Sequence, residues 1–335
     1  MIREAIGMLA TGRDLSEQEM AQCIGEIMDG VATEGQMGAF LMALKLKGET
    51  IEELSGAALA MRQRAIKISA PEGAIDTCGT GGDDSGTFNI STASAIVVAA
   101  CGVPVAKHGN RSVTSKAGSA DVLEALGVKI DLRPEQVEAC LFETNFGFLF
   151  APNFHPVMRH AAKVRRDIGI RTIFNLLGPI TNPACTKRQI IGIFDPGLTE
   201  RIAHVLNRLG SERAWVVHGL EGIDEVSLLD KTLVSELTDG KVQTFCIDPA
   251  MAGLKSHPLE AIIGGTKEVN AEIILSILEG TKGPQRDIVL LNAAAALVVA
   301  AKASDLKTGV SIAAEAVDSK RALNKLKQVV GFTNA

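Results

Sequence analysis

Apolar residues in the first seventy positions recur at the spacing of helices. Met20, Ile24 and Ile27 lie three or four positions apart, so they share one face of a predicted helix. Two stretches match the S/T-x-x-E capping box at a helix start: Ser16 with Glu19 and Thr50 with Glu53. No stretch here alternates with a period of two. The pattern predicts four short helices packed on one another in residues 1–70, ending at the SAPEG run of 69–73.

From Ala74 onward, short β-rich runs alternate with helical ones. The expected strands are 74–78, 103–107, 128–132, 189–194 and 213–219, and the expected helices are 91–102, 119–127 and 198–210. Such a β-α-β rhythm predicts a mostly parallel sheet with helices on its faces. We therefore expect an α/β fold made of a small all-helical N-terminal domain (1–70) and a larger α/β domain (71–335).

The last third of the chain departs from this rhythm. Two strand-like runs within 231–247 flank Asp239-Gly240, which predicts an antiparallel hairpin. From about residue 267 the pattern is helical again. The apolar run 288–301 is interrupted by Asn292 and is too short to span a membrane, so we expect a buried core helix.

Composition excludes some classes of function. Charged residues make up 22% of the 335-residue chain, hydrophobic residues 46% and aromatic residues 4%, and the formal net charge is −5. These values are ordinary for a globular protein and unfavourable for nucleic-acid binding, which uses basic surfaces and stacking rings. The six cysteines show no metal-type spacing, and the N-terminus lacks the apolar core of a signal peptide. We expect a cytoplasmic protein without nucleic-acid or membrane partners.

The stretch GTGGDDSGTFNIST (79–92) follows an expected strand and precedes an expected helix. Glycines allow a close approach to phosphate, and a helix N-terminus supplies free N–H donors. The spacing matches neither the dinucleotide fingerprint nor the P-loop. The alternative is a tight turn capped by Asn89 or Ser91. The carboxylates Asp83 and Asp84 make this an unusual anion site.

Three further segments carry candidate chemistry. Residues 105–121 combine cations with small polar residues, also between a strand and a helix, so both loops belong at the same edge of the sheet. Adjacent Asp224 and Glu225 suit a hard cation such as Mg²⁺, although such pairs are more often solvated surface. Residues 155–183 form a basic patch in which one inward arginine would bind a carboxylate, and spacing alone does not identify it.

Taken together, these segments resemble the anthranilate phosphoribosyltransferases over essentially the whole chain. The resemblance is carried by GTGGDDSGTFNISTA, KHGNRSVTSKAGSADVLEALG, RRDIGIRTIFNLLGPITNPA and GIDEVS, in that order. It implies an arrangement like that of the pyrimidine nucleoside phosphorylases, with helices from about 160–180 joining the helical domain in space. It also implies a homodimer formed through the helical domain. The implied reaction transfers the 5-phosphoribosyl group of 5-phosphoribosyl 1-diphosphate to the amino group of anthranilate, with Mg²⁺ ions bound as a pair in each subunit.

The resemblance also implies a role for each matching residue. Metal would be held by Ser91, Asp224 and Glu225. Anthranilate would lie against Gly79, His108, Asn110, His155 and Arg165, near the hinge-like Gly178-Pro179. The phosphoribosyl diphosphate would be held by Gly79, Gly82, Asp83, Thr87, Asn89, Ile90, Ser91, Thr92, Lys107, His108, Gly109, Asn110, Arg111, Ser112, Val113, Thr114, Ser115 and Ser119. No residue is expected to be an essential general base, with His108 as a candidate late proton acceptor.

Two alternatives and one departure accompany this interpretation. A nucleoside phosphorylase would share the phosphate loop, but the KxSTGG-like loop of those enzymes is absent. A non-catalytic nucleic-acid-binding relative would be basic and often lacks the acidic pair. Many relatives carry Gly where this chain has Asp84, which leaves the role of Asp84 open, and we expect that side chain to face solvent.

Overall fold

A seven-stranded sheet forms the centre of the computed structural model, which describes residues 1–112 and 116–335. The strand order is β3-β2-β1-β4-β5-β6-β7. The first five strands in this order pair in parallel, whereas β6 pairs antiparallel with both β5 and β7. The strands are β1 (Ile75–Thr77), β2 (Val105–Gly109), β3 (Phe146–Phe150), β4 (Arg188–Gly192), β5 (Arg213–Gly219), β6 (Thr232–Thr238) and β7 (Lys241–Ile247). The mostly parallel sheet and the terminal hairpin confirm the predicted fold class.

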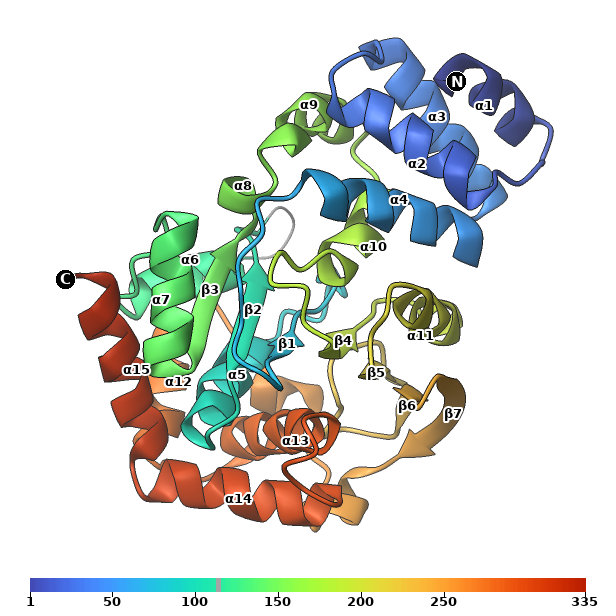
Figure 1. Cartoon of the computed structure of the whole chain (residues 1–335). Coiled ribbons are helices and arrows are strands. Elements are labelled where there is room, and N and C mark those ends of the chain that lie inside the picture. Colours follow the sequence, from blue (N-terminus) through green and yellow to red (C-terminus); the bar gives the residue numbers. More distant parts are fainter. Residues whose placement is uncertain (113–115) are drawn as a thin grey trace.

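Helices cover the sheet and build a separate bundle beside it (Figure 1). The bundle contains α1 (Ile2–Ala10), α2 (Glu17–Met28), α3 (Glu34–Lys47) and α4 (Ile51–Arg64). The remaining helices are α5 (Ile90–Ala100), α6 (Ser119–Ala125), α7 (Pro134–Thr144), α8 (Ala151–Phe154), α9 (Arg159–Ile168), α10 (Ile173–Ile180), α11 (Thr199–Arg208), α12 (Lys267–Leu278), α13 (Pro284–Val299), α14 (Leu306–Asp318) and α15 (Arg321–Thr333). In the part of the chain that the structure describes, no helix has the length and apolarity to cross a bilayer.

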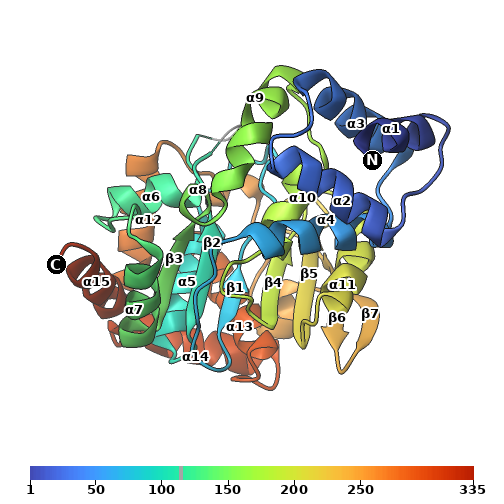
Figure 2. The same ribbon diagram turned by 45° about the horizontal axis from the view of Figure 1, so that its top comes forward.

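Two large hydrophobic cores lie on the two faces of the sheet. One packs α5 and α12 to α15 against the sheet, and the other joins α1 to α4 with α9 to α11. Successive residues of β4 alternate between them, since Ile190 belongs to the first core and Ile191 to the second. Helices α9 and α10 thus pack with the N-terminal bundle although they follow it by about a hundred residues (Figure 2).

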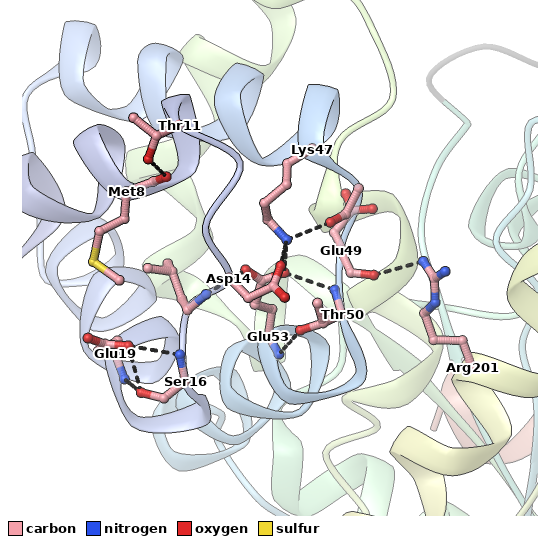
Figure 3. A network of polar contacts seen from close by, with 12 residues as sticks. Met8, Thr11, Asp14, Ser16, Glu19, Lys47, Glu49, Thr50, Glu53 and Arg201 are labelled. Carbon is pink, nitrogen blue, oxygen red and sulfur yellow. Dashed lines mark hydrogen bonds and ion pairs between the residues drawn. The ribbon is translucent and has the colours of Figure 1, made fainter.

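The helical bundle is fixed by the predicted caps and by a buried ion pair (Figure 3). Both capping boxes form, and the Glu53 side chain also accepts hydrogen bonds from the Leu15 N–H at 2.9 Å and Lys47 Nζ at 2.9 Å. From α11, Arg201 Nη1 donates to the Glu49 carbonyl at 2.7 Å. The bundle is therefore tied to the sheet layer by polar contacts as well as by a shared core.

One predicted strand is wrong and one strand was not predicted. Residues 128–132 form no strand, although Val128, Ile130 and Leu132 are buried, because the segment bonds to side chains, such as the Thr333 hydroxyl that accepts from the Lys129 N–H at 3.3 Å, and not to a neighbouring strand. The edge strand beside β2 is instead Phe146–Phe150, which is almost entirely buried and therefore shows no alternation. The apolar run 288–301 is the buried core helix α13, as expected.

Candidate active site

The glycine turn after β1 lies directly against the end of β4 and the turn after β5. The Thr80 N–H donates to the Gly192 carbonyl at 2.9 Å. A Cβ atom on Gly192 would lie 1.5 Å from the Asp224 carbonyl oxygen, and one on Gly79 would lie 3.0 Å from Asp224 Oδ2. Only glycine permits backbones to approach this closely. The carboxyl ends of β1, β4 and β5 therefore converge on the acidic pair.

Asp224 and Glu225 face the start of α5 and the glycine turn. The Gly81 N–H donates to Asp224 Oδ2 at 2.7 Å, and the Ser91 N–H donates to Glu225 Oε1 at 3.1 Å. Asp83 joins them, since its Oδ2 accepts from the Asp224 N–H at 3.3 Å. Burial, with the Asp83 charge nearby, raises the pKa of Asp224 well above its usual range and that of Glu225 to about 8.

This donor set fits a hard divalent cation. Carboxylate and hydroxyl oxygens gather here, and the crowding of like charges disfavours the ionised carboxylates unless a cation is near. Among residues 1–112 and 116–335, no three His, Cys, Asp or Glu side chains form a complete metal site. The residues suit Mg²⁺ best, because Mg²⁺ binds to one or two carboxylates and completes its shell with water and substrate phosphates.

Lys107 in β2 supplies a buried cation at the same place. Its side chain is 1% exposed, and Nζ donates to the Thr77 carbonyl at 2.7 Å and lies 3.5 Å from Ser91 Oγ. No carboxylate lies within ion-pair distance of Lys107 among the described residues. A buried ammonium held only by neutral oxygens is costly, so Lys107 could stabilise an anion at this place.

Asn292 of α13 binds the backbone of the acidic turn through two hydrogen bonds. Its Oδ1 accepts from the Val226 N–H at 2.9 Å, and its Nδ2 donates to the Val226 carbonyl at 2.8 Å. The polar residue that interrupts the apolar run of this helix is therefore a clamp on the residue after Glu225. The sequence pattern showed the interruption but not its partner.

Asn292→Ala should lower the free energy of unfolding by about 2–4 kcal/mol, because it leaves both polar groups of Val226 buried and unpaired. Urea denaturation measures this cost. Asn207→Ala, which removes a hydrogen bond to the Gly240 carbonyl away from the site, serves as the control. An equal, small loss in both variants would contradict the clamp.

The start of α5 is held from two sides. Asn89 does not cap the helix through its side chain. Its Nδ2 donates to the Ala117 carbonyl at 3.1 Å, and its Oδ1 accepts from Asn270 Nδ2 at 3.0 Å. The two predicted substrate loops thus meet through Asn89, and α12 fixes the orientation of that amide. Asn89 thus occupies the N-cap position that the alternative interpretation gave to Asn89 or Ser91, but its side chain binds the neighbouring loop and not the N–H groups of the helix.

Residues of the second loop occupy different positions. Val113, Thr114 and Ser115 lie outside the described residues. Arg111 pairs with Asp121 and Glu124, and its guanidinium stacks on Phe150. The Ser112 N–H donates to Asp121, Ser119 Oγ donates to the Asn110 carbonyl at 3.3 Å, and Asn110 itself is exposed.

Two buried histidines, His108 of β2 and His155 just after α8, lie side by side. The ring centroids of His108 and His155 are 5.3 Å apart, and His108 Nδ1 is 3.0 Å from the Gly178 carbonyl. Because that carbonyl only accepts, Nδ1 carries the proton and Nε2 is a free acceptor. Nε2 of each ring is buried without a partner in the described part of the chain. Burial lowers the pKa of His108 to about 3 and that of His155 to about 4.

The buried His155 should make folding less favourable in acid. The unfolded chain gains a proton near pH 6.5 whereas the folded chain gains it only near 4, so stability falls as pH drops through this window. Replacing His155 with Asn should remove about 2 kcal/mol of the loss between pH 8 and pH 5. Urea denaturation at the two pH values measures the difference. The same substitution at exposed His204 should reproduce the wild-type loss; identical losses in all three proteins would refute the argument.

The basic patch divides into arginines with distinct roles. Arg165 stacks over Phe174 at 5.3 Å, and burial lowers its pKa. No carboxylate is paired with it within the residues that the structure describes. Arg171 stacks over Phe194 at 4.5 Å and donates to the Gly82 carbonyl. Arg159 and Arg166 are exposed. Arg165 is therefore the arginine with an uncommitted guanidinium beside an aromatic ring.

Asp84 faces solvent, as expected, and also meets Arg171. Its side chain is 81% exposed, and Oδ2 lies 3.3 Å from Arg171 Nη2. Its φ of 58° lies in the left-handed region, which glycine adopts at a lower energy than residues with a Cβ atom. Such a pair on the surface contributes little stability, so Asp84 attaches the glycine loop only loosely to the segment before α10.

Most of the remaining predicted residues lie in the same glycine loop and at the start of α5, and Gly109 lies at the end of β2. Gly82 lies under the Arg171 guanidinium, and the Thr87 N–H is 3.4 Å from Ser85 Oγ. Ile90 begins α5 and is buried, and the Thr92 hydroxyl is buried without a partner among the described residues. Gly109 ends β2 against Ser119 and Phe148. The predicted residues of 79–92 thus lie together in the glycine loop and the first turn of α5.

Comparison with known proteins agrees with this geometry. Residues 3–65 match the helical bundle domain of a glycosyl transferase family, and residues 71–323 match its a/b domain. The anthranilate phosphoribosyltransferase of Acetivibrio thermocellus is 52% identical over 100% of this chain and 97% of its own length. That of Petrotoga mobilis is 53% identical over 96% of this chain and 94% of its own.

Solved structures agree as closely. The crystal structure of the Thermus thermophilus enzyme has a TM-score of 0.94 and 43% identity, with 99% of both chains covered. The Saccharomyces cerevisiae enzyme in complex with PRPP and Mg has a TM-score of 0.91 and 29% identity, covering 99% of this chain and 98% of its own. Fold, site geometry and similarity over the full length lead to one conclusion: this chain belongs to the anthranilate phosphoribosyltransferase family.

Proposed function

We propose that the site transfers the 5-phosphoribosyl group of 5-phosphoribosyl 1-diphosphate to the amino group of anthranilate and releases pyrophosphate. The observation that carries the proposal is the meeting of one buried cation, Lys107, with the acidic pair and the N-terminus of α5. A diphosphate needs all three kinds of group, because its charge must be balanced and its metal ions held. The yeast relative with PRPP and Mg supports this ligand.

Departure of pyrophosphate is the step in which charge develops. Negative charge collects on the leaving group while the ribose becomes cationic, and Lys107 and the backbone N–H groups of the glycine turn stabilise the former. Asp224, Glu225 and the Ser91 hydroxyl would hold Mg²⁺, which when bound neutralises diphosphate charge. Asp83 accepts hydrogen bonds from Ser85 at 2.7 Å and from the Asp224 N–H, so it keeps the loop and the acidic turn in register. The carboxylates of the glycine loop therefore serve a ligand that arrives with metal.

The nucleophile needs orientation more than activation. An aryl amine is neutral near pH 7, so its lone pair is already free, and positioning supplies much of the rate. Arg165 binds the anthranilate carboxylate, and the free Nε2 of His108 accepts a hydrogen bond from the amine. With its pKa lowered to about 3, His108 is a weak base, so the product proton passes to water. The yeast relative solved with 4-fluoroanthranilate supports this acceptor class.

Arg165→Gln tests the acceptor side. The KM for anthranilate should rise about a hundredfold because the bidentate carboxylate contact is lost, while the KM for phosphoribosyl diphosphate should change little. Exposed Arg166→Gln, one residue along the same helix, is the matched control and should behave as wild type. Equal anthranilate KM values in the wild type and Arg165→Gln would remove Arg165 from the proposal.

Several finer features belong to the same proposal. The protein acts as a cytoplasmic homodimer joined through residues 1–70, each subunit holding Mg²⁺ ions as a pair. The exposed Val31 (69%) and Leu46 (81%) on the helical bundle support an interface there. Light scattering at micromolar concentration should give twice the chain mass of 35.2 kDa, and a value of one chain mass would count against the dimer.

A further inference from the structure

The side chain of Asp76 is a buried carboxylate for which no substrate role is proposed. It lies next to the diphosphate side of the site at Lys107 and to the anthranilate side at His108. Asp76 in β1 is 0% exposed, and no cation pairs with it within ion-pair distance in the described residues. Burial raises its pKa to about 6 against the opposing attraction of the Lys107 ammonium. Burying a carboxylate without a paired cation costs folding free energy, so we ask what its hydrogen bonds hold in place.

Each oxygen of Asp76 is bound to a different half of the site. Oδ1 accepts the His108 N–H at 3.1 Å, from the strand that carries both Lys107 and His108. Oδ2 accepts Asn182 Nδ2 at 2.6 Å, just beyond α10. Asn182 Nδ2 also donates to the Ala106 carbonyl of β2 at 2.8 Å. Asp76 and Asn182 therefore bind each other and both bind the backbone of β2.

The same elements meet again at the histidine ring. His108 Nδ1 donates to the Gly178 carbonyl, so the end of α10 is attached to β2 both through that ring and through Asp76 and Asn182. Moving Asp76 would therefore shift the backbone of Lys107 and His108 together with the Gly178 segment. The carboxylate touches neither proposed substrate position and acts through its neighbours.

We propose that Asp76 is a positioning residue that holds the diphosphate-binding Lys107 and the anthranilate-binding His108 in one fixed geometry through the His108 N–H and Asn182. This inference rests on the substrate roles proposed above for those two residues. With the Asn182 amide oriented by the Ala106 carbonyl and the Ala184 N–H, the position calls for a side chain that accepts at both oxygens, as a carboxylate does. An amide of the same shape would always present its NH₂ group to one of two donors, the His108 N–H or Asn182 Nδ2.

Asp76→Asn in the full-length protein tests the inference. The KM values for both substrates should rise together, each by about tenfold, and kcat should fall by a similar factor, because small displacements of reacting groups are costly. Asn182→Ala, which removes the partner and keeps the carboxylate, should move all three parameters the same way. Ser235→Ala is the control: Ser235 is a fully buried residue of β6 in the same sheet, and the variant removes its hydrogen bonds to Thr199 of α11 and Thr244 of β7. It should lower Tm without changing either KM.

Hydrogen exchange supplies a readout that does not depend on turnover. Amides within 105–109 and 178–182 should exchange faster together in Asp76→Asn, and neither should change in Ser235→Ala. Wild-type KM values and exchange in Asp76→Asn, with only Tm lowered, would overturn the inference. If Asp76→Asn does not fold, Asn182→Ala decides by the same criteria. An inactive wild type would refute the proposed function instead. Hydrogen exchange in 105–109 and 178–182 would still test whether Asp76 couples these two segments.

Discussion

Replacing Asp224 with Asn and Glu225 with Gln together should abolish transfer without unfolding the protein. Both amides can still accept the existing hydrogen bonds from the Gly81 and Ser91 N–H groups. Removing two of three crowded carboxylates relieves their repulsion in the metal-free protein, so Tm should stay equal or rise. The oxygen charges that hold Mg²⁺ against the leaving diphosphate are lost, so kcat/KM should fall by about a thousandfold or more.

Anthranilate consumption and thermal unfolding, each with and without Mg²⁺, measure the two effects. Asp230→Asn, which neutralises a carboxylate in the segment after the acidic turn, is the control and should keep both activity and Mg²⁺ dependence. A double variant that retains activity would remove the acidic pair from the mechanism. A large fall in Tm would show instead that the pair is structural.

Lys107→Met should separate activity from stability in the same way. The unbranched methionine fills most of the buried volume of the lysine stem and removes a cation held only by neutral oxygens, so stability should change by no more than about 1–2 kcal/mol. Pyrophosphate departs beside this ammonium, so kcat/KM should fall by about a thousandfold. Lys107→Arg should not restore activity, because a planar guanidinium does not fit the space of a compact ammonium.

Exposed Lys129→Met controls for the loss of one positive charge and should behave as wild type. Steady-state kinetics with phosphoribosyl diphosphate varied, together with urea denaturation, gives both quantities. If Lys107→Met were fully active, the leaving-group role of Lys107 would be wrong. If it were unfolded, the lysine would be part of the core architecture.

Much of this fold could be predicted because its signals are local. The capping box at Ser16 satisfies its own helix, and the Asp239-Gly240 turn determines its own hairpin. The segment 128–132 lacks such a local signal. Alternating burial records which side of the chain faces the core, whereas a strand also needs a neighbour at hydrogen-bonding distance, and nothing in VKIDL shows whether one is there.

The site residues that were not predicted act across long sequence separations. Asn292 braces Val226 from 66 residues away, and Asn270 orients Asn89 across 181. Asp76 was visible as a charge in an apolar strand, a signal that marks a buried polar contact but not its partners. Gly192 looks like an ordinary strand end until the Asp224 backbone is placed against it.

Transfer of the phosphoribosyl group can be followed through the fluorescence of anthranilate mixed with the protein and 5-phosphoribosyl 1-diphosphate. With Mg²⁺ present, the anthranilate signal should fall while pyrophosphate appears in equal amount, and chelation of Mg²⁺ should stop both. The alternative within this fold predicts phosphorolysis of thymidine or uridine. A flat anthranilate trace with Mg²⁺ present, or phosphorolysis in its place, would contradict the account.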